Sequence, residues 1–371
     1  MMGENSLQER FSPKLEGMDR FLSDAGSGML FPIIPLFAAA ALGAPAILIG
    51  LAESIPAFFS QLPRLLPEEI SRDRKLRASA IALCAIARPL TAQCSSFPEF
   101  ISLRSADSAA EKSAFPNGQL QTGKTPFGAQ LQNHGGTILG ALLAILLLFF
   151  LGSQASAADS YRTIILLSAV PAALVLIPFL LTKEKYYSKN AKENAPALPQ
   201  SISAPLAISS AFLLSKAGIL LFLLAASASL PPVLVVLSYL IFLASKAAFP
   251  LPSRLLCNAL GQKKAFILGC MLFSMAALSF SLPLDAQLSI ALFAFLGFSS
   301  TLLDSAYNED DLPLAGKYPI LSGALLIGAN LIAGLLWGEH FAQMHAPFLF
   351  SCALSLASVF AFSIYADEKR H

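Results

Sequence analysis

The chain alternates between long apolar blocks and shorter polar stretches. Most apolar blocks are about 20 residues long, which is the length a helix needs to cross about 30 Å of hydrocarbon. The blocks are continuously apolar and lack a period of two, so helices are favoured over the strands of a membrane barrel. The pattern predicts twelve spanning helices, at 20–40, 43–63, 76–95, 97–115, 127–153, 161–182, 203–226, 231–252, 263–282, 286–306, 317–338 and 344–366.

Composition supports a membrane protein. Hydrophobic residues make up 55% of the 371 residues and charged residues only 13%, and the mean hydropathy is +0.65. Soluble domains carry about 25% charged residues, so this chain has too few to cover a water-exposed surface. The net charge of +2 gives no indication of a nucleic-acid partner. We therefore expect an all-α protein whose immediate surroundings are a lipid bilayer.

The fourth predicted span, 97–115, is the weakest of the twelve. It contains Arg104, Asp107 and Glu111, and hydropathy alone would reject it. Without this span, every later loop would change sides. A re-entrant or interfacial segment is the alternative, but it would require another crossing elsewhere to restore the orientation of the following helices.

Basic residues support the twelve-span arrangement because they gather on one side of it. They occur in the segments 10–20, 64–77, 183–192, 254–264, 317 and 369–370. The opposite loops hold little beyond Arg162. An excess of Lys and Arg marks the cytoplasmic side. We therefore expect a multi-pass protein of the cytoplasmic (inner) membrane with both termini in the cytoplasm.

A polar stretch at 183–202, rich in Lys, Asn and Pro, divides six predicted spans from six. It is typical of a flexible linker. The predicted organisation is a six-helix half at 1–182, a cytoplasmic linker and a second six-helix half at 203–371. Parallel repeats of this kind are a known transporter design.

Several fragments are similar to the major facilitator superfamily, most closely to its prokaryotic efflux-like members. They are Phe21–Asp24, Met29–Phe37, Leu42–Pro45, Ile49–Ser54, Ala87–Leu90, Tyr161–Thr163 and Pro252–Lys264. The resemblance covers nearly the whole chain. It implies the major facilitator fold, with two pseudo-symmetric six-helix halves around a central cavity.

The loops that follow the second and eighth spans depart from the family pattern. In the second-half loop, Asn258 stands where the family has Asp, and Arg254 stands where it has its first Gly. The first-half loop keeps its basic end, and Glu69 is its candidate acid. These departures put the family's gating contacts in doubt, although the fold is unaffected. The resemblance suggests a set of gate or loop residues: Glu69, Arg74, Lys75, Asn258, Gly261, Lys263 and Lys264.

Charged residues inside predicted spans are the candidates for substrate contact or ion coupling, because such residues usually face an interior or a water-filled cavity. Glu53, Arg88 and Lys216 lie near the middle of their spans. The alternative for each is a structural ion pair. We expect Glu53 and Arg88 to form a coupled pair, because opposite charges lower each other's cost in the membrane.

Three further charged residues lie nearer to span ends. Lys246 and Asp304 are predicted towards the cytoplasmic ends of their helices. Asp304 is a candidate gate partner of basic residues, and Lys246 could instead extend to the interface. Asp24 falls in the first turn of the first predicted span, where a helix cap is the favoured interpretation and a gate residue the alternative.

The chain offers no motif for a cofactor. Its five cysteines form no CxxC pair, and Gly261-Gln-Lys-Lys lacks the spacing of a phosphate-binding loop. No catalytic constellation or metal-ligand cluster is evident, so we predict neither an enzyme nor a metal protein.

The sequence thus predicts a secondary transporter that moves a small solute by alternating access. The resemblance to efflux-like members suggests export as the direction. Its expected partners are the solute and a coupling ion, with a proton as the candidate, and a monomer is expected. The alternative is a degenerate family member that no longer transports and acts as a sensor or assembly partner.

Overall fold

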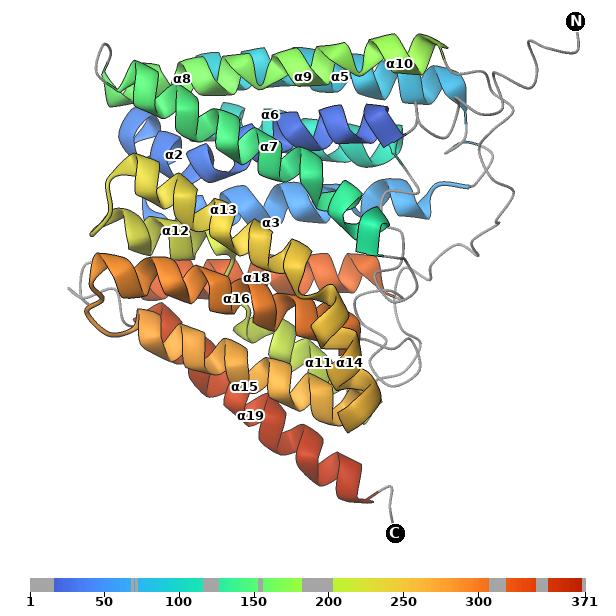
Figure 1. Cartoon of the computed structure of the whole chain (residues 1–371), viewed down its shortest axis with the longest axis vertical. Coiled ribbons are helices and arrows are strands. Elements are labelled where there is room, and N and C mark those ends of the chain that lie inside the picture. The colour runs from blue at the N-terminus through green and yellow to red at the C-terminus, as the bar shows by residue number, and fades with distance from the viewer. Residues whose placement is uncertain are drawn as a thin grey trace, which may run out of the picture.

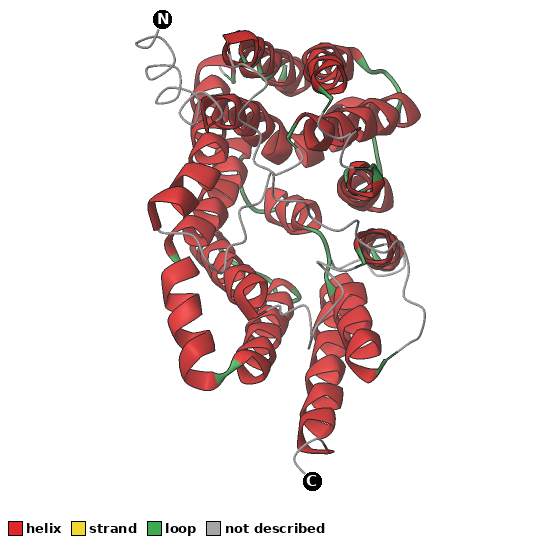
Figure 2. Cartoon of the chain, turned by 90° about the vertical axis from the view of Figure 1, so that its right-hand side faces the viewer, coloured by secondary structure: helices red, strands yellow, loops and turns green. Residues whose placement is uncertain are grey.

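The structure is a computed structural model that describes residues 17–67, 70, 73–115, 127–152, 156–181, 203–306, 318–337 and 346–368. The described residues form helices and connecting loops, with no strand among them. Figure 1 shows the first and second halves of the chain as two stacked groups of helices. Figure 2 shows the same two groups from one end, with many helices seen nearly along their axes.

The first half begins with a helix that starts at Gly17 and runs to Leu42. The following elements complete this half: η1 (Phe31–Ile33) and α2 (Ile34–Leu42) within that helix, then α3 (Ala46–Phe59), η2 (Leu62–Leu65), α5 (Arg74–Gln93), α6 (Phe97–Ala114), α7 (Phe127–Leu151), α8 (Ala157–Leu167), α9 (Ala169–Leu174) and α10 (Leu176–Leu181).

The second half has a similar order of helices. Its elements are α11 (Ala204–Ser215), α12 (Ile219–Ser227), α13 (Pro232–Ala248), α14 (Pro250–Leu260), α15 (Gln262–Phe280), α16 (Ala286–Ala306), α18 (Pro319–Leu336) and α19 (Ala346–Glu368). Each of the twelve predicted spans therefore coincides with one helix or with two or three consecutive helices.

Among the described residues, nine helices are long and apolar enough to cross a membrane, or ten when α13 and α14 count as one bent span. The two remaining long helices are α5, with 20 residues, and α6, with 18. Both carry several charged side chains, which explains their low hydropathy. The helical nature of the doubtful segment 97–115 is confirmed, and the full count of twelve crossings stays a prediction.

Local sequence explains where several helices begin and end. Gly43 ends α2 in the left-handed conformation, with φ 60°, which a glycine adopts without strain. Asp73 begins α5, because its side chain accepts a hydrogen bond from the Lys75 N–H at 2.9 Å. Between α13 and α14 the chain bends by 52°. Pro250 and Pro252 follow the bend directly, as expected for residues that cannot donate a backbone hydrogen bond.

The two halves meet mainly where α3 packs against α18 and α12, α7 against α13, and α2 against α12. Figure 1 places α2 and α12 at the end of the bundle opposite to the one where the first helix begins and α19 ends. The start of the first described helix and the end of the last therefore lie at the same end, in agreement with an even number of passes.

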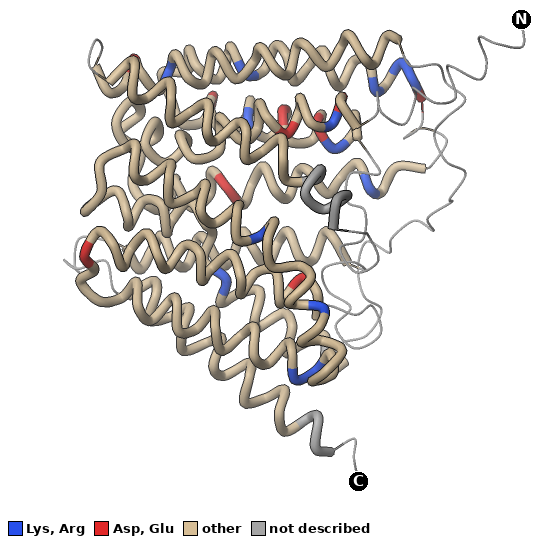
Figure 3. Tube along the Cα trace, in the orientation of Figure 1, with Lys and Arg blue, Asp and Glu red and all other residues tan. Residues whose placement is uncertain are grey.

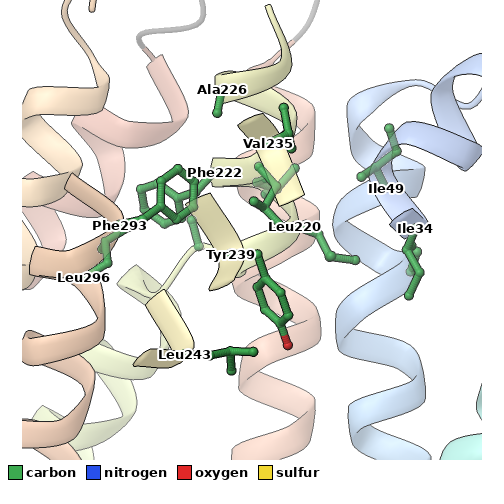
Figure 4. Close-up of a cluster of buried hydrophobic side chains, with 14 of the residues drawn as sticks. Ile34, Ile49, Leu220, Phe222, Ala226, Val235, Tyr239, Leu243, Phe293 and Leu296 are labelled. Carbon is green, nitrogen blue, oxygen red and sulfur yellow. The ribbon is translucent and has the colours of Figure 1, made fainter. Parts of the chain in front are cut away.

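Each half has its own kind of core. The second half is rich in aromatic contacts, and the ring centre of Phe222 lies 4.8 Å from that of Phe348 and 5.0 Å from that of Phe280. Figure 4 shows Phe222 with Phe293 in the second half and, beside them, Leu220 on the side that faces Ile34 and Ile49 of the first half. The apolar core therefore continues across the interface between the halves at the level of α12.

The first half is held by close helix approach and by buried charges. The helix that starts at Gly17 crosses α7 so closely that a Cβ on Gly140 would overlap the Ala25 carbonyl oxygen. Small residues at a crossing allow two backbones to approach in this way, as is common between membrane helices. The buried charges are centred on Arg88.

Candidate functional site

Charged residues are sparse within the helical body, and most Lys and Arg lie towards the end where the first described helix begins (Figure 3). Three groups of charged side chains inside the bundle contain the residues considered first. The first is centred on Arg88, the second on Glu53 and the third on the Lys246–Asp304 pair.

Arg88 of α5 is completely buried, with 0% of its side chain exposed. Its Nε lies 3.3 Å from Oδ1 of Asp107, and its Nη2 donates to the Ser27 hydroxyl at 2.9 Å. Its Nη1 donates to the Ser168 carbonyl at 3.4 Å, and Glu111 lies 3.8 Å from Nη2. Arg88 thus joins the first helix, α5, α6 and the turn between α8 and α9.

The acidic partners of Arg88 come from α6, the helix whose charges made it doubtful in the sequence. Asp107 also accepts from Arg104 at 2.7 Å, and the Ser27 hydroxyl donates to Glu111 at 3.1 Å. Two arginines and two carboxylates therefore form one group whose formal charges sum to zero. Such an arrangement offsets the cost of burying each charge.

The predicted pair of Glu53 and Arg88 is wrong. The Arg88 side chain pairs with carboxylates of α6, whereas the Glu53 side chain points towards the second half of the molecule. The position of each residue along its predicted span placed both charges near the middle of the membrane. It could not show which face of its helix each residue occupies. The sequence did contain one indication of the partners of Arg88. The charged residues in 97–115 need partners of opposite charge if that segment is a buried helix.

Glu53 of α3 makes a contact across the two halves. Its carboxylate accepts the backbone N–H of Leu220 at 2.8 Å and that of Ile219 at 3.2 Å. Both N–H groups belong to the first turn of α12, whose donors have no partner inside the helix. Glu53 therefore caps a helix of the opposite half, and its negative charge faces the positive end of that helix dipole.

A second side chain completes this contact. Asn330 of α18 accepts the Gly218 N–H with Oδ1 at 2.9 Å, while its Nδ2 donates to the Leu326 carbonyl at 3.0 Å. A Cβ on Gly218 would overlap Oε2 of Glu53 and would lie 2.7 Å from Oδ1 of Asn330. The interface at this point requires a glycine. We call the contact of Glu53 and Asn330 with residues 218–220 the helix-break latch.

The latch exists because the predicted span 203–226 is not one continuous helix. It is interrupted between α11 and α12, and Lys216 stands at the interruption with φ −81° and ψ 87°. Lys216 lies near the middle of the span Leu206–Ser227, as predicted, but it stands at a break between two helices and not inside a continuous one. Lys216 is partly exposed, and it makes no ion pair or hydrogen bond through its side chain with any described residue.

Lys246 of α13 and Asp304 of α16 form the third group. Their side-chain atoms Nζ and Oδ2 lie 3.3 Å apart, and Asp304 is 41% exposed. The structure therefore brings these two predicted residues together. Asp304, Lys246 and Glu53 are the charged side chains of the described residues that lie near enough to act on Lys216.

Asp24 pairs with Arg20, one helical turn earlier, at 3.6 Å. The helix already includes Gly17, so Asp24 lies about two turns inside it and does not cap it. The interpretation of Asp24 as a first-turn cap is therefore wrong, and its role as a gate residue stays a prediction.

The loop residues predicted from the resemblance are dispersed along one end of the bundle. Arg74 lies over the Phe179 ring at 5.6 Å, and Lys75 is exposed. Asn258 is exposed near the end of α14, and Gly261 makes the turn into α15 with φ 81°. Lys263 and Lys264 follow in the first turn of α15, and Glu69 lies outside the described residues.

The described residues hold no group of three or more His, Cys, Asp or Glu side chains that could bind a metal ion. The five cysteines are all free and buried.

Comparison with known proteins gives a consistent result, although no family model matches the chain. An uncharacterized MFS-type transporter of Methanocaldococcus jannaschii is 25% identical over 96% of this chain and 95% of its own length. The solved structure of the nucleoside transporter NupG matches 94% of this chain and 98% of its own, with a TM-score of 0.69 and 13% identity.

Other solved transporters have the same fold. A bacterial homologue of the human drug peptide transporters PepT1 and PepT2 covers 96% of this chain and 97% of its own, with a TM-score of 0.68 and 8% identity. The xylose transporter XylE from E. coli covers 94% of this chain and 96% of its own, with a TM-score of 0.59 and 12% identity. The proteins that the chain resembles are transporters, not enzymes. The chain is thus a multi-pass membrane protein with the major facilitator fold, and its resemblance to transporters of that superfamily is confirmed.

Proposed function

We propose that the chain is a secondary transporter that moves a small solute across the cytoplasmic membrane by alternating access. Its two halves would be 1–182 and 203–371, with 183–202 as a cytoplasmic linker and both termini in the cytoplasm. The fold and the similarity to transporters support this proposal. The observation that carries it is the helix-break latch, because it joins the halves through a few polar contacts that can be broken.

The latch suits a gate for physical reasons. A carboxylate that accepts backbone N–H groups is a strong acceptor, yet every partner in this contact can be hydrated when the halves separate. In the proposed orientation, α2 and α12 lie at the outer end, so the structure corresponds to a state that is closed to the outside. At the other end, α14 bends away from the axis of α13 by 52°.

An ion gradient would drive the cycle, with a proton as the candidate ion. XylE, one of the structural neighbours, is described as a proton:xylose symporter. Glu53 is the acidic group in the best position to couple an ion to gating, because neutralising it weakens the latch directly. The Lys246–Asp304 pair is a candidate gate or substrate contact in the second half.

A reversible lock tests the proposal. Ala41 lies near the end of α2 and Ser229 directly after α12, so cysteines at these positions would bridge the two outer ends. Protein-containing liposomes would be given a mixture of organic acids, sugars, nucleosides and amines, with and without a proton gradient, and uptake would be measured by mass spectrometry.

We expect a thiol-cleavable bifunctional crosslinker to stop protein-dependent uptake and a reducing agent to restore it. The two single-cysteine variants, treated identically, are the control. Absence of any protein-dependent uptake, or uptake that continues in the crosslinked protein, would favour the alternative of a non-transporting sensor or assembly partner.

A further inference from the structure

At the interruption between α11 and α12, Lys216 carries a positive charge that no anion among the described residues matches, and this charge indicates what kind of solute the protein takes. We propose that Lys216 is a substrate-binding residue and that the transported solute carries a negatively charged group, such as a carboxylate or a phosphate. This inference rests on the proposed function.

Each neighbouring charge already has its own partner. Asp304 is paired with Lys246 at 3.3 Å. Glu53 is held by the N–H groups of Ile219 and Leu220. Although the formal charges of these four side chains sum to zero, the geometry leaves the Lys216 ammonium without an anion within 4.0 Å among the described residues.

The donors of the adjacent helix end are not available to a ligand in this state. The N–H groups of Gly218, Ile219 and Leu220 are already bonded to Asn330 and Glu53. Lys216 therefore differs from the backbone donors at the break, because its three ammonium hydrogens have no acceptor among the described residues.

The position of Lys216 suits a substrate contact. It is half-buried and lies near the middle of the span Leu206–Ser227. The charges that act on it come from α3, α13 and α16, and so from both halves. Interrupted helices in transporters occur where they line a binding site near the middle of the membrane. An ammonium that has no anionic partner among the described residues is costly at such a place unless an anion joins it during the cycle.

The alternative is that Lys216 only adjusts the Lys246–Asp304 pair. A solute without negative charge would then be taken, and the charge of Lys216 would matter for stability alone. The two cases differ in the charge of the transported solute, so the test uses matched compounds.

The experiment is competitive uptake into proteoliposomes from an equimolar mixture of charged and uncharged counterparts. The pairs are glucose 6-phosphate with glucose, glutamate with glutamine, and succinate with succinamide, together with uridine and putrescine as neutral and cationic members. Wild type is compared with Lys216→Gln, Lys216→Arg and Lys185→Gln, the last of which removes one positive charge from the polar stretch between the two halves of the sequence.

We expect uptake of at least one anionic member and not of its neutral counterpart. That uptake should fall roughly tenfold or more in Lys216→Gln, as for loss of one hydrogen bond to a charged group. It should be largely retained in Lys216→Arg and unchanged in Lys185→Gln. The melting temperature of each purified variant in detergent separates a folding defect from a binding defect.

Three results would overturn the inference. Protein-dependent uptake of only neutral or cationic members would contradict it while leaving the proposed transport function intact. Anion uptake that survives in a stable Lys216→Gln protein would remove Lys216 from the site. Absence of uptake of every compound would reject the proposed function and the inference together.

Discussion

Glu53 and Leu220 are 167 positions apart in the chain, yet the carboxylate of Glu53 accepts the Leu220 N–H at 2.8 Å. The contact joins the second helix of the first half to the second segment of an interrupted helix in the other half. Few other polar contacts between described residues connect the two halves. The strength of the contact between Glu53 and α12 should therefore influence how often the two halves separate at the α2–α12 end of the bundle.

Replacing Glu53 with Gln should shift the protein towards the state that is open at the α2–α12 end. The amide retains one acceptor oxygen but loses the charge, and hydrogen bonds to charged groups contribute about 1.5–3 kcal/mol. The ratio of closed to open molecules should fall by about tenfold or more. Spin labels at Ala41 and Ser229, in a background without native cysteines, report the distance between the two ends.

The matched control is Glu99→Gln, which changes an exposed carboxylate in the first turn of α6. The label distances of this variant should equal those of the parent protein. If Glu53→Gln gives the same distance distribution as Glu99→Gln, the latch does not control closure of this end.

Gly218→Ala should disrupt the same contact from the other side. The added methyl group would overlap Oε2 of Glu53 and crowd Oδ1 of Asn330, so at least one of the two acceptors must withdraw. Uptake should be reduced, and the label distance between Ala41 and Ser229 should increase. Gly135→Ala is the control, because a Cβ there would lie 3.4 Å from the Phe21 ring, which is ordinary contact. Equal behaviour of the two variants would show that Gly218 is not a steric requirement of the latch.

The helical architecture could be predicted from the sequence because it depends on a strong local signal. An apolar block of membrane length has few alternatives to a helix, and this held even for 97–115, where the orientation of later loops supported a segment that hydropathy rejected. The sequence also placed Lys246 and Asp304 towards the same ends of their helices, although it did not predict that they pair. These features require only the length and depth of each segment.

The partners of Glu53 and Arg88 could not be predicted in the same way. Their similar depth in the membrane suggested that the two side chains are neighbours. The residues that each side chain actually contacts depend on how its helix is rotated and on which helices pack together. The partners of Glu53 are backbone N–H groups, which any residue except proline supplies, so no sequence pattern identifies them. The interruption at Lys216 was also missed, because Ala217 and Gly218 are compatible with a continuous membrane helix.

The two halves should associate when they are produced as separate chains, 1–190 and 191–371. Each half inserts its own helices, and their interface buries α3 against α18 and α7 against α13. A tagged first fragment should retain the second during purification in mild detergent. In the second fragment, Gly334→Ala should weaken this retention because its Cβ would overlap Ile47 of α3.

Gly328→Ala is the control for this experiment, since its Cβ would only approach the end of the Leu214 side chain, in the same half, at 3.3 Å. Failure of the unmodified fragments to associate would contradict the assignment of 183–202 as a linker between two bundles. Equal retention of both glycine variants would show that Gly334 does not limit the approach of α3 and α18.

Arg88→Gln should destabilise the first half. A second substitution that restores stability should then show whether the carboxylate next to Arg88 belongs to α6, as in the structure, or is Glu53, as expected from its depth in the membrane. Removing one member of a buried ion pair costs about 3–5 kcal/mol, because the remaining charge is left uncompensated. After this change, Asp107 still pairs with Arg104 at 2.7 Å, so the unbalanced charge is that of Glu111. The melting temperature in detergent should fall clearly.

Adding Glu111→Gln to Arg88→Gln should restore part of this loss, because it leaves the neutral pair of Arg104 and Asp107 alone in the interior. Adding Asp107→Asn should not, because Arg104 would then lose its partner. Adding Glu53→Gln should give no rescue, since Glu53 lies at the latch with α12. Arg162→Gln is the control, with a smaller effect expected because this partly exposed side chain donates to the Cys94 carbonyl at 3.3 Å and lies over the Phe37 ring, but pairs with no carboxylate among the described residues. Rescue by Glu53→Gln and not by Glu111→Gln would contradict the arrangement of charges described for α5 and α6.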